Sequence, residues 1–153
     1  GPTSLILSRQ NLAHQARSDA QLADIQRGAY ILEDCAGTPE LIVIATGSEV
    51  AIARDAVKQL QESGVQARLV SMPSANVFEA QDADYRERVL PLSVRKRVAV
   101  EAAAVDYWHK YVGLDGAIIG MNRFGESAPG GVLMKEFGFT ADNIVAKAHA
   151  LLK

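Results

Sequence analysis

Ten residues organise this chain: Leu41-Ile42-Val43-Ile44-Ala45-Thr46-Gly47-Ser48-Glu49-Val50. The first five are apolar with no polar residue between them, which predicts a strand buried on both faces, as in the centre of a parallel sheet. Thr46-Gly47 ends this strand, and a helix is predicted from Ser48 to about Glu62, with Gly64 as the residue that ends it. Strand, tight turn and helix make half of a βαβ unit, and ligands usually bind at such turns in open α/β sheets.

The turn over residues 46–49 has two interpretations. Free N–H groups at a helix N-terminus can bind a phosphate. However, the turn contains one glycine rather than a glycine-rich phosphate motif, and Glu49 places a carboxylate where a phosphate would approach. The favoured interpretation is therefore structural: Ser48 caps the helix, or Thr46 and Glu49 form a capping box.

Further apolar runs, separated by turn residues, predict a mixed sheet between helices. Strands are expected at 28–32, 41–45, 65–71, 97–101 and 116–120. Besides 48–62, helices are expected at 79–88, 105–111, 131–137 and 140–152. The connection over 35–40 is too short for a parallel crossover, so the strands on either side of it are predicted to be antiparallel neighbours, with 29–35 at an edge. The alternation of elements predicts an α/β fold with helices on both faces of the sheet.

The amino-terminal part of the chain is less regular. Residues 4–8 are mostly apolar and predict a short buried strand. Residues 10–24 show no apolar periodicity, which indicates a linker with at most one helical turn near 21–26.

Composition excludes several classes of protein. The chain has 153 residues, of which 48% are hydrophobic and 22% charged, as in an ordinary globular domain. The formal net charge is −2 with Lys and Arg scattered, which argues against nucleic-acid binding. Cys35 is the only cysteine, so an internal disulfide is excluded. No apolar run approaches the ~20 residues that span a bilayer, and the amino end lacks a secretory signal pattern, so the expected compartment is the cytoplasm.

Few residues are candidates for chemistry. Arg9 directly follows the predicted strand at 4–8, where its guanidinium could bind a phosphate or carboxylate bidentately; a surface salt bridge is the alternative. Glu101 and Asp106 lie at a strand-to-helix junction, where helix caps are commoner than catalytic carboxylates. The aromatic run at 107–111 is interpreted as packing. The sequence contains no evident nucleophile–base pair, metal cluster or glycine-rich phosphate cradle.

Five tracts stand out when the chain is taken as a whole. They are Gly1-Pro2-Thr3 with Leu7-Ser8-Arg9-Gln10-Asn11-Leu12, then Ala45-Thr46-Gly47-Ser48-Glu49-Val50, Val70-Ser71-Met72-Pro73-Ser74, Tyr107-Trp108 with Lys110-Tyr111-Val112-Gly113-Leu114, and Phe124-Gly125-Glu126-Ser127-Ala128-Pro129. Together, and in this order, they resemble the carboxyl-terminal part of a transketolase, the thiamine-diphosphate-dependent ketol transferase. The 1-deoxyxylulose-5-phosphate synthases share that architecture but are not similar in these tracts.

The resemblance implies a three-layer α/β/α domain over residues 23–153, with a five-stranded mixed sheet and one antiparallel edge strand. It assigns residues 1–22 to the end of a pyrimidine-binding domain and a linker. It also implies an activity, the transfer of a two-carbon ketol unit from a ketose phosphate to an aldose phosphate in the pentose phosphate pathway. In the family, the arginine of the Ser-Arg-Gln-Asn tract binds the phosphate of the sugar substrate, and Arg9 matches it.

The resemblance places the cofactors outside this chain. In the family, thiamine diphosphate and its Mg²⁺ or Ca²⁺ bind between two other domains, which also contain the catalytic residues. This chain is therefore expected to contain no catalytic, cofactor-binding or metal-binding residue and to be inactive alone. Its expected role is structural, dimer-stabilising or regulatory, in a cytoplasmic homodimer that binds sugar phosphates but neither nucleic acid nor membrane. The alternative is a non-catalytic α/β ligand-binding or assembly module, with the turn at 46–49 or the loop at 124–129 as its site.

Overall fold

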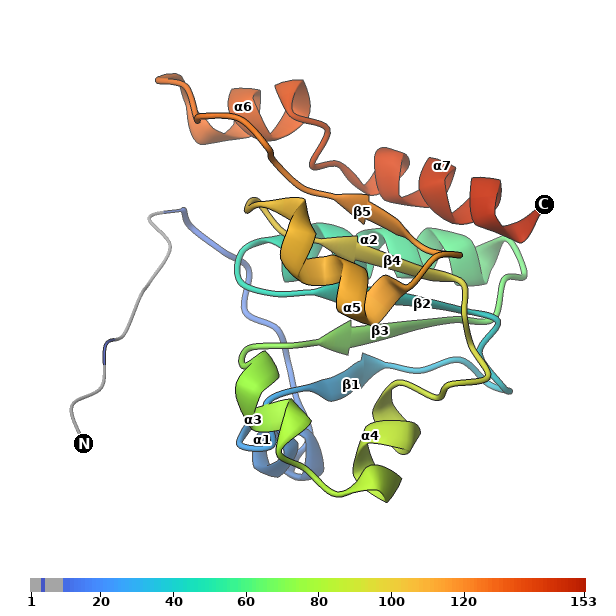
Figure 1. The fold of residues 1–153 in the computed structure, drawn as a ribbon. Helices are drawn as coiled ribbons and strands as arrows, with labels where there is room; N and C mark the ends of the chain where they lie inside the picture. Colours follow the sequence, from blue (N-terminus) through green and yellow to red (C-terminus); the bar gives the residue numbers. More distant parts are fainter. Residues whose placement is uncertain (1–3, 5–9) are drawn as a thin grey trace.

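The centre of the molecule is a five-stranded sheet in the order β1-β3-β2-β4-β5 (Figure 1). The computed structural model describes residues 4 and 10–153, so the predicted strand at 4–8 lies almost wholly outside the described residues. The strands are β1 (Tyr30–Glu33), β2 (Leu41–Ala45), β3 (Ala67–Ser71), β4 (Arg97–Val100) and β5 (Ala117–Ile119). All pairs are parallel except that of β1 with β3. The predicted mixed sheet with one antiparallel edge strand is confirmed.

Strand β2 supplies both faces of the core. Leu41, Val43 and Ala45 point into one apolar cluster, and Ile42 and Ile44 point into the other. All five side chains are completely buried, which explains why the strand has no polar alternation.

Helices cover both faces of the sheet (Figure 1). The first cluster is closed by α2 (Glu49–Glu62) and α7 (Ala141–Leu152). The second is closed by α3 (Ala75–Glu79), α4 (Ala83–Val89), the 3-10 helix η1 (Val105–Trp108) and α5 (His109–Val112). The remaining helices are α1 (Asp19–Ile25) and α6 (Gly130–Glu136). The three-layer α/β/α prediction is confirmed.

The predicted neighbour of β1 is wrong. β1 pairs with β3, with Tyr30 opposite Ser71, and does not pair with β2. The crossover through α2 inserts β3 between β1 and β2, so the connection at 34–40 passes over the end of β3. It must cross two strand spacings, roughly 10 Å, which six or seven residues span easily. The short connection therefore predicts correctly that β1 runs antiparallel to β2, but it does not predict which strand pairs with β1.

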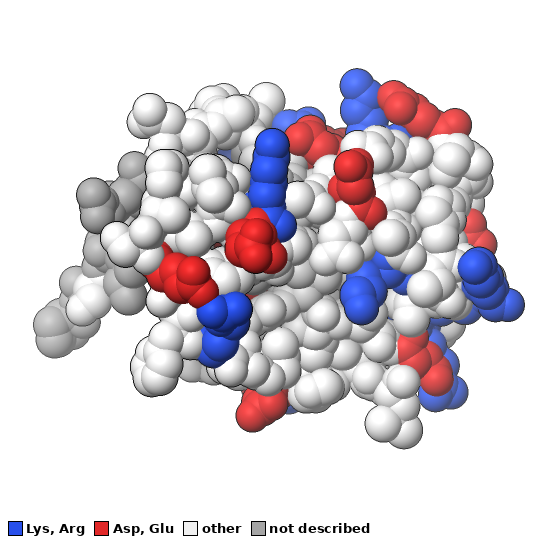
Figure 2. Space-filling view, turned by 90° about the horizontal axis from the view of Figure 1, so that it is seen from above, with Lys and Arg blue, Asp and Glu red and all other residues white. Residues whose placement is uncertain are grey.

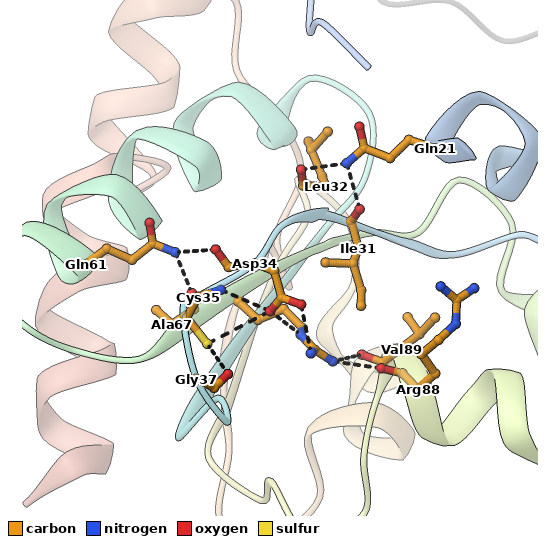
Figure 3. Close-up of polar contacts among 11 residues, drawn as sticks. Gln21, Ile31, Leu32, Asp34, Cys35, Gly37, Gln61, Ala67, Arg88 and Val89 are labelled. Atoms are coloured by element: carbon orange, nitrogen blue, oxygen red, sulfur yellow. Dashed lines mark hydrogen bonds and ion pairs between the residues drawn. The ribbon is translucent and has the colours of Figure 1, made fainter. Parts of the chain in front are cut away.

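An arginine on β3 holds this connection in place (Figure 3). The Arg68 guanidinium donates two hydrogen bonds to the Asp34 carboxylate, Nε to Oδ1 at 2.9 Å and Nη2 to Oδ2 at 3.0 Å. Its Nη1 donates to the carbonyls of Arg88 and Val89 at the end of α4. The Gln61 side chain also donates to the carbonyl of Asp34. These contacts join the connection to α2, β3 and α4.

The amino-terminal linker contains more structure than predicted. Helix α1 forms two turns where at most one was expected, and a capping box begins it. The Ser18 hydroxyl accepts from Gln21 N at 3.2 Å, and the Gln21 side chain accepts from Ser18 N at 3.0 Å. The Gln21 amide then donates to the carbonyls of Ile31 and Leu32 in β1 (Figure 3). The Ser-x-x-Gln spacing at 18–21 was the local signal for this helix.

The helix predicted at 79–88 corresponds to α4 alone, which begins four residues later than predicted, and α3 before it was not predicted. α3 ends at Glu79 and α4 begins at Ala83, where the Asp82 carboxylate accepts from Tyr85 N at 2.7 Å. Asp82 is the signal that the prediction missed, because an N-cap aspartate marks a new helix start.

Gly64 ends α2 as predicted. Its φ is +93°, its N–H donates to the Gln61 carbonyl, and the N–H of Val65 donates to the Leu60 carbonyl, both at 3.0 Å. These two bonds are those of a Schellman motif, which needs a left-handed residue at this position.

Replacing Gly64 with alanine should lower the free energy of unfolding by about 1 kcal/mol. No atom lies within 4 Å of the added methyl group, so the cost comes from the backbone conformation alone. Gly37→Ala is the control, since Gly37 has no positive φ and its added methyl group would meet only Gln66 Oε1, at 3.6 Å; a change within ~0.5 kcal/mol is expected there. Equal urea midpoints for both variants would contradict this account.

Candidate functional site

The carboxyl ends of the parallel strands border a pocket of about 340 Å³. Its walls come from the linker, from β1, from the turn after β2 and the start of α2, and from the end of β3 and the residues after it. They include Leu12, Gln15, Arg17, Tyr30, Gly47, Ser48, Ser71 and Pro73. This is the edge at which ligands usually bind in open α/β sheets. Arg9, the predicted phosphate-binding residue, lies outside the described residues, three positions before Leu12.

The turn after β2 is not capped as predicted. Ser48 has helical φ and ψ, and its hydroxyl donates to Glu49 Oε1 at 2.7 Å instead of capping α2. Thr46 contributes its carbonyl, which accepts from Glu49 N at 3.3 Å. Both the Ser48 cap and the Thr46/Glu49 capping box are therefore wrong.

Glu49 stabilises the start of α2 in another way. It is the first residue of the helix, it is only 4% exposed, and its carboxylate lies at the positive end of the helix dipole. A buried negative charge at this place opposes the binding of a phosphate by the same N–H groups. The geometry thus agrees with a structural interpretation of the turn.

The linker is fastened to the domain beside the pocket. Arg17 donates through Nε to the Tyr30 hydroxyl and through Nη1 to the Gln15 carbonyl, both at 2.6 Å. Arg54 on α2 donates to Gln15 Oε1 at 3.0 Å and forms an ion pair with Glu33 on β1. These contacts hold residues 15–17 against β1 and α2, at the carboxyl edge of the sheet.

The aromatic run packs as predicted. Trp108 and Tyr111 are buried in the second cluster with their ring centroids 5.8 Å apart, while Tyr107 is half exposed. The Trp108 indole donates to Glu101 Oε2 at 2.8 Å. Glu101 therefore binds a side chain rather than capping a helix, and η1 begins without a side-chain cap. The predicted capping role of Glu101 is wrong.

A polar cluster that sequence reasoning missed joins α3 to α5. The Tyr111 hydroxyl and the Lys110 ammonium group both donate to Glu79 Oε1. The bonds from Lys110 and Tyr111 lower the pKa of Glu79, whereas burial and then the bond to Glu79 raise the pKa of Tyr111. Both shifts hold each group in its ordinary charge state at neutral pH, so the cluster is suited to stabilising the fold rather than to proton transfer. About thirty residues separate its members, so no local pattern could have revealed it.

Clusters of metal-ligand side chains are absent from the described part of the chain. No three His, Cys, Asp or Glu side chains among residues 4 and 10–153 lie close enough together to hold one. None of the helices in that part has both the length and the apolar character to cross a membrane. Acidic and basic side chains are intermingled on the face seen in Figure 2, without a continuous area of one sign.

Comparison with known proteins identifies the family. Residues 28–140 match the model of the transketolase-like TK C-terminal domain. Transketolase 1 of Escherichia coli is 65% identical over 152 residues, and transketolase 1 of Vibrio cholerae is 60% identical over 151 residues. Each alignment covers 99% of this chain but only 23% of the relative, so the chain spans about a quarter of the relatives it matches.

Solved structures agree with this result. The transketolase of Leishmania mexicana superposes with a TM-score of 0.84 at 40% identity, covering 94% of this chain and 20% of that one. A Pichia stipitis transketolase in complex with sedoheptulose-7-phosphate gives a TM-score of 0.81 at 34% identity with the same coverages. This chain belongs to the transketolase C-terminal domain family.

Proposed function

We propose that this chain is the carboxyl-terminal quarter of a transketolase subunit, which transfers a two-carbon ketol unit from a ketose phosphate to an aldose phosphate in the pentose phosphate pathway. The observation that supports this most is the 65% identity with E. coli transketolase 1 over almost the whole chain. The complex of a Pichia stipitis relative with sedoheptulose-7-phosphate supports sugar phosphates as substrates. The full protein is a cytoplasmic homodimer in this proposal. The chain divides into residues 1–22, which comprise the end of the pyrimidine-binding domain and the linker, and residues 23–153, the carboxyl-terminal domain.

Thiamine diphosphate and Mg²⁺ or Ca²⁺ are the proposed cofactors, held by domains outside this chain. When bound, thiamine diphosphate supplies the electron sink for the transfer. At the start of α2 the buried Glu49 carboxylate opposes the binding of a diphosphate to the free N–H groups there. The domain itself supplies a stable support beside the active site, with a structural, dimer-stabilising or regulatory role.

Arg9 is the one residue of the chain proposed to touch substrate. Its guanidinium presents parallel N–H groups that match two oxygens of a sugar phosphate. It precedes the pocket residue Leu12 by three positions, which is at most about 10 Å of extended chain. The hydrogen bonds of Gln15 with Arg54 and of Arg17 with Tyr30 hold residues 15–17 at the carboxyl edge of the sheet.

Removing the cofactors from the full-length protein should abolish ketol transfer. Dialysis against a chelator should lower the rate by at least on the order of 100-fold, because the cofactor carries the chemistry. Adding thiamine diphosphate with Mg²⁺ should restore it. Residues 1–153 alone should show no transfer under either condition, and ketol transfer by the chain alone would contradict the proposal.

A second candidate is a ligand-binding module that uses the pocket at the carboxyl edge. Ser71 favours it: this serine is only 5% exposed, it lines the pocket, and no described residue hydrogen-bonds to its hydroxyl. Calorimetric titration of the full-length protein with nucleotides, before and after Ser71→Ala, would separate the candidates. Binding that Ser71→Ala weakens tenfold supports the module, and the absence of heat excludes nucleotides as its ligand.

A further inference from the structure

One segment of the domain, a loop followed by the first turn of a helix, is exposed along its whole length. Residues 122–132, the loop after β5 and the start of α6, are all exposed. Helix α6 contains no buried residue, in contrast to α2 and α7. Phe124 is 95% exposed, although an aromatic ring of this size ordinarily contributes through burial. Within the described domain α6 packs on the first cluster through the partly buried Met134, whereas Val132 near its start is 57% exposed.

This segment lies at the carboxyl edge of the sheet, as the linker does. Met121, the second residue after β5, donates its N–H to the Ala103 carbonyl beyond the end of β4. Leu12 of the linker lies beside the turn after β2, at the same edge, and is itself half exposed. In Figure 1, α6 with its preceding loop and the start of the described linker extend from the same end of the molecule. The chain therefore enters the domain on the side where this segment is exposed.

The charges beside Phe124 also favour a protein surface as its partner. Arg123 and Glu126 form an ion pair with each other. The loop consequently presents an aromatic ring next to a neutralised pair, rather than a single-sign patch. An apolar pocket with a polar rim is the surface that fits such a group.

We propose that residues 122–129 and α6 dock onto the part of the same subunit that precedes this chain, with Phe124 inserted as the anchor. The inference rests on the proposed function, since the chain covers only 23% of its transketolase relatives and matches their carboxyl-terminal domain. The upstream domain is covalently joined through a linker that is fastened to the same edge. A partner tethered this closely has a high effective concentration, of the order of millimolar, so a modest apolar contact suffices to hold it.

The test uses the full-length subunit with Phe124→Cys and, as the matched control, Leu114→Cys. Leu114 is 99% exposed but lies at the amino end of β5, at the opposite edge of the sheet. The rate of maleimide labelling is measured at each position by peptide mass spectrometry, in the native and in the urea-unfolded protein. At position 124 the native rate should be at least tenfold lower than the unfolded rate. Native labelling at the unfolded rate would overturn the proposal.

A cross-linking experiment identifies which part of the protein contacts position 124. A benzophenone maleimide is attached to the new thiol of the Phe124→Cys variant under partial denaturation, and after refolding the protein is mixed as ¹⁴N and ¹⁵N subunits and irradiated. Cross-links from position 124 to upstream residues with no mixed-isotope pairs support docking within one subunit. Mixed-isotope pairs, or no upstream cross-link, overturn it. Ketol transfer by the unsubstituted protein is assayed separately. If the protein catalyses ketol transfer but position 124 labels at the unfolded rate, only the docking is rejected. If position 124 is protected from labelling but the protein catalyses no ketol transfer, only the proposed function is rejected.

Discussion

Replacing Arg9 with alanine should lower kcat/KM for a phosphorylated ketose donor by roughly 10- to 150-fold, while an unphosphorylated donor should change by about twofold or less. Hydrogen bonds between charged groups contribute about 1.5–3 kcal/mol each, and 1.4 kcal/mol corresponds to a factor of ten. An unphosphorylated donor lacks the group that Arg9 is proposed to bind. The ratio of the two losses therefore measures phosphate recognition separately from damage to the fold.

Two variants complete this experiment in the full-length protein. Arg9→Lys keeps the charge but loses the bidentate fork, so its loss for the phosphorylated donor should be intermediate. Arg95→Ala removes an arginine whose side chain is 71% exposed and pairs with Asp115, before the start of β4, and should leave both donors unaffected. Equal losses for both donor types in Arg9→Ala would remove Arg9 from the substrate site.

Replacing Arg97 with methionine should cost about 3–5 kcal/mol of unfolding free energy. Arg97 lies in β4 and is only 9% exposed. Its guanidinium donates to four backbone carbonyls, at 2.8–3.2 Å; these belong to Leu90, Pro91, Val94 and Tyr111. No carboxylate pairs with it among the described residues. Burial lowers the pKa of Arg97, although an arginine remains charged at any physiological pH.

The free energy of unfolding falls because the buried carbonyls lose their hydrogen-bond donor, not because a positive charge is removed. Leu90 and Tyr111 lie at or near the carboxyl ends of α4 and α5, where free carbonyls and the helix dipoles attract a positive charge. Methionine fills much of the same volume but donates nothing, so several buried acceptors lose their partners. Arg95→Met is the control two residues away, and its exposed ion pair should contribute less than about 1 kcal/mol. Urea unfolding of both variants measures the difference, and a loss below ~1 kcal/mol for Arg97→Met would contradict it.

The sequence predicted the elements whose residues satisfy local rules. The uninterrupted apolar run at 41–45 identified a strand buried on both faces, and Gly64 marked the end of α2 through its left-handed conformation. The order of the strands could not be predicted in the same way. Whether β3 or β2 lies beside β1 depends on the α2 crossover and on the Arg68–Asp34 ion pair, which joins residues 34 positions apart.

Residue patterns predicted less of the candidate site than of the fold. The Ser48 cap is a plausible local rule that the fold does not use, because the hydroxyl binds the neighbouring Glu49 carboxylate instead. The Glu79, Lys110 and Tyr111 cluster forms only after α3 and α5 come together. Arg9 was selected mainly through the resemblance to transketolases, since the spacing alone leaves a surface salt bridge as the alternative role for an arginine after a strand.

The fastening of the linker has a practical consequence for anyone who recombines or truncates proteins of this family. Cutting the chain at residue 23 would discard Ser18 and Gln21, which start α1, and Arg17, which donates to Tyr30. A chimera joined there would place a foreign segment against β1 and α2 without its matching donors. A junction for domain exchange should therefore lie before Leu12, so that residues 12–22 stay in the same chimera as the sheet that they contact.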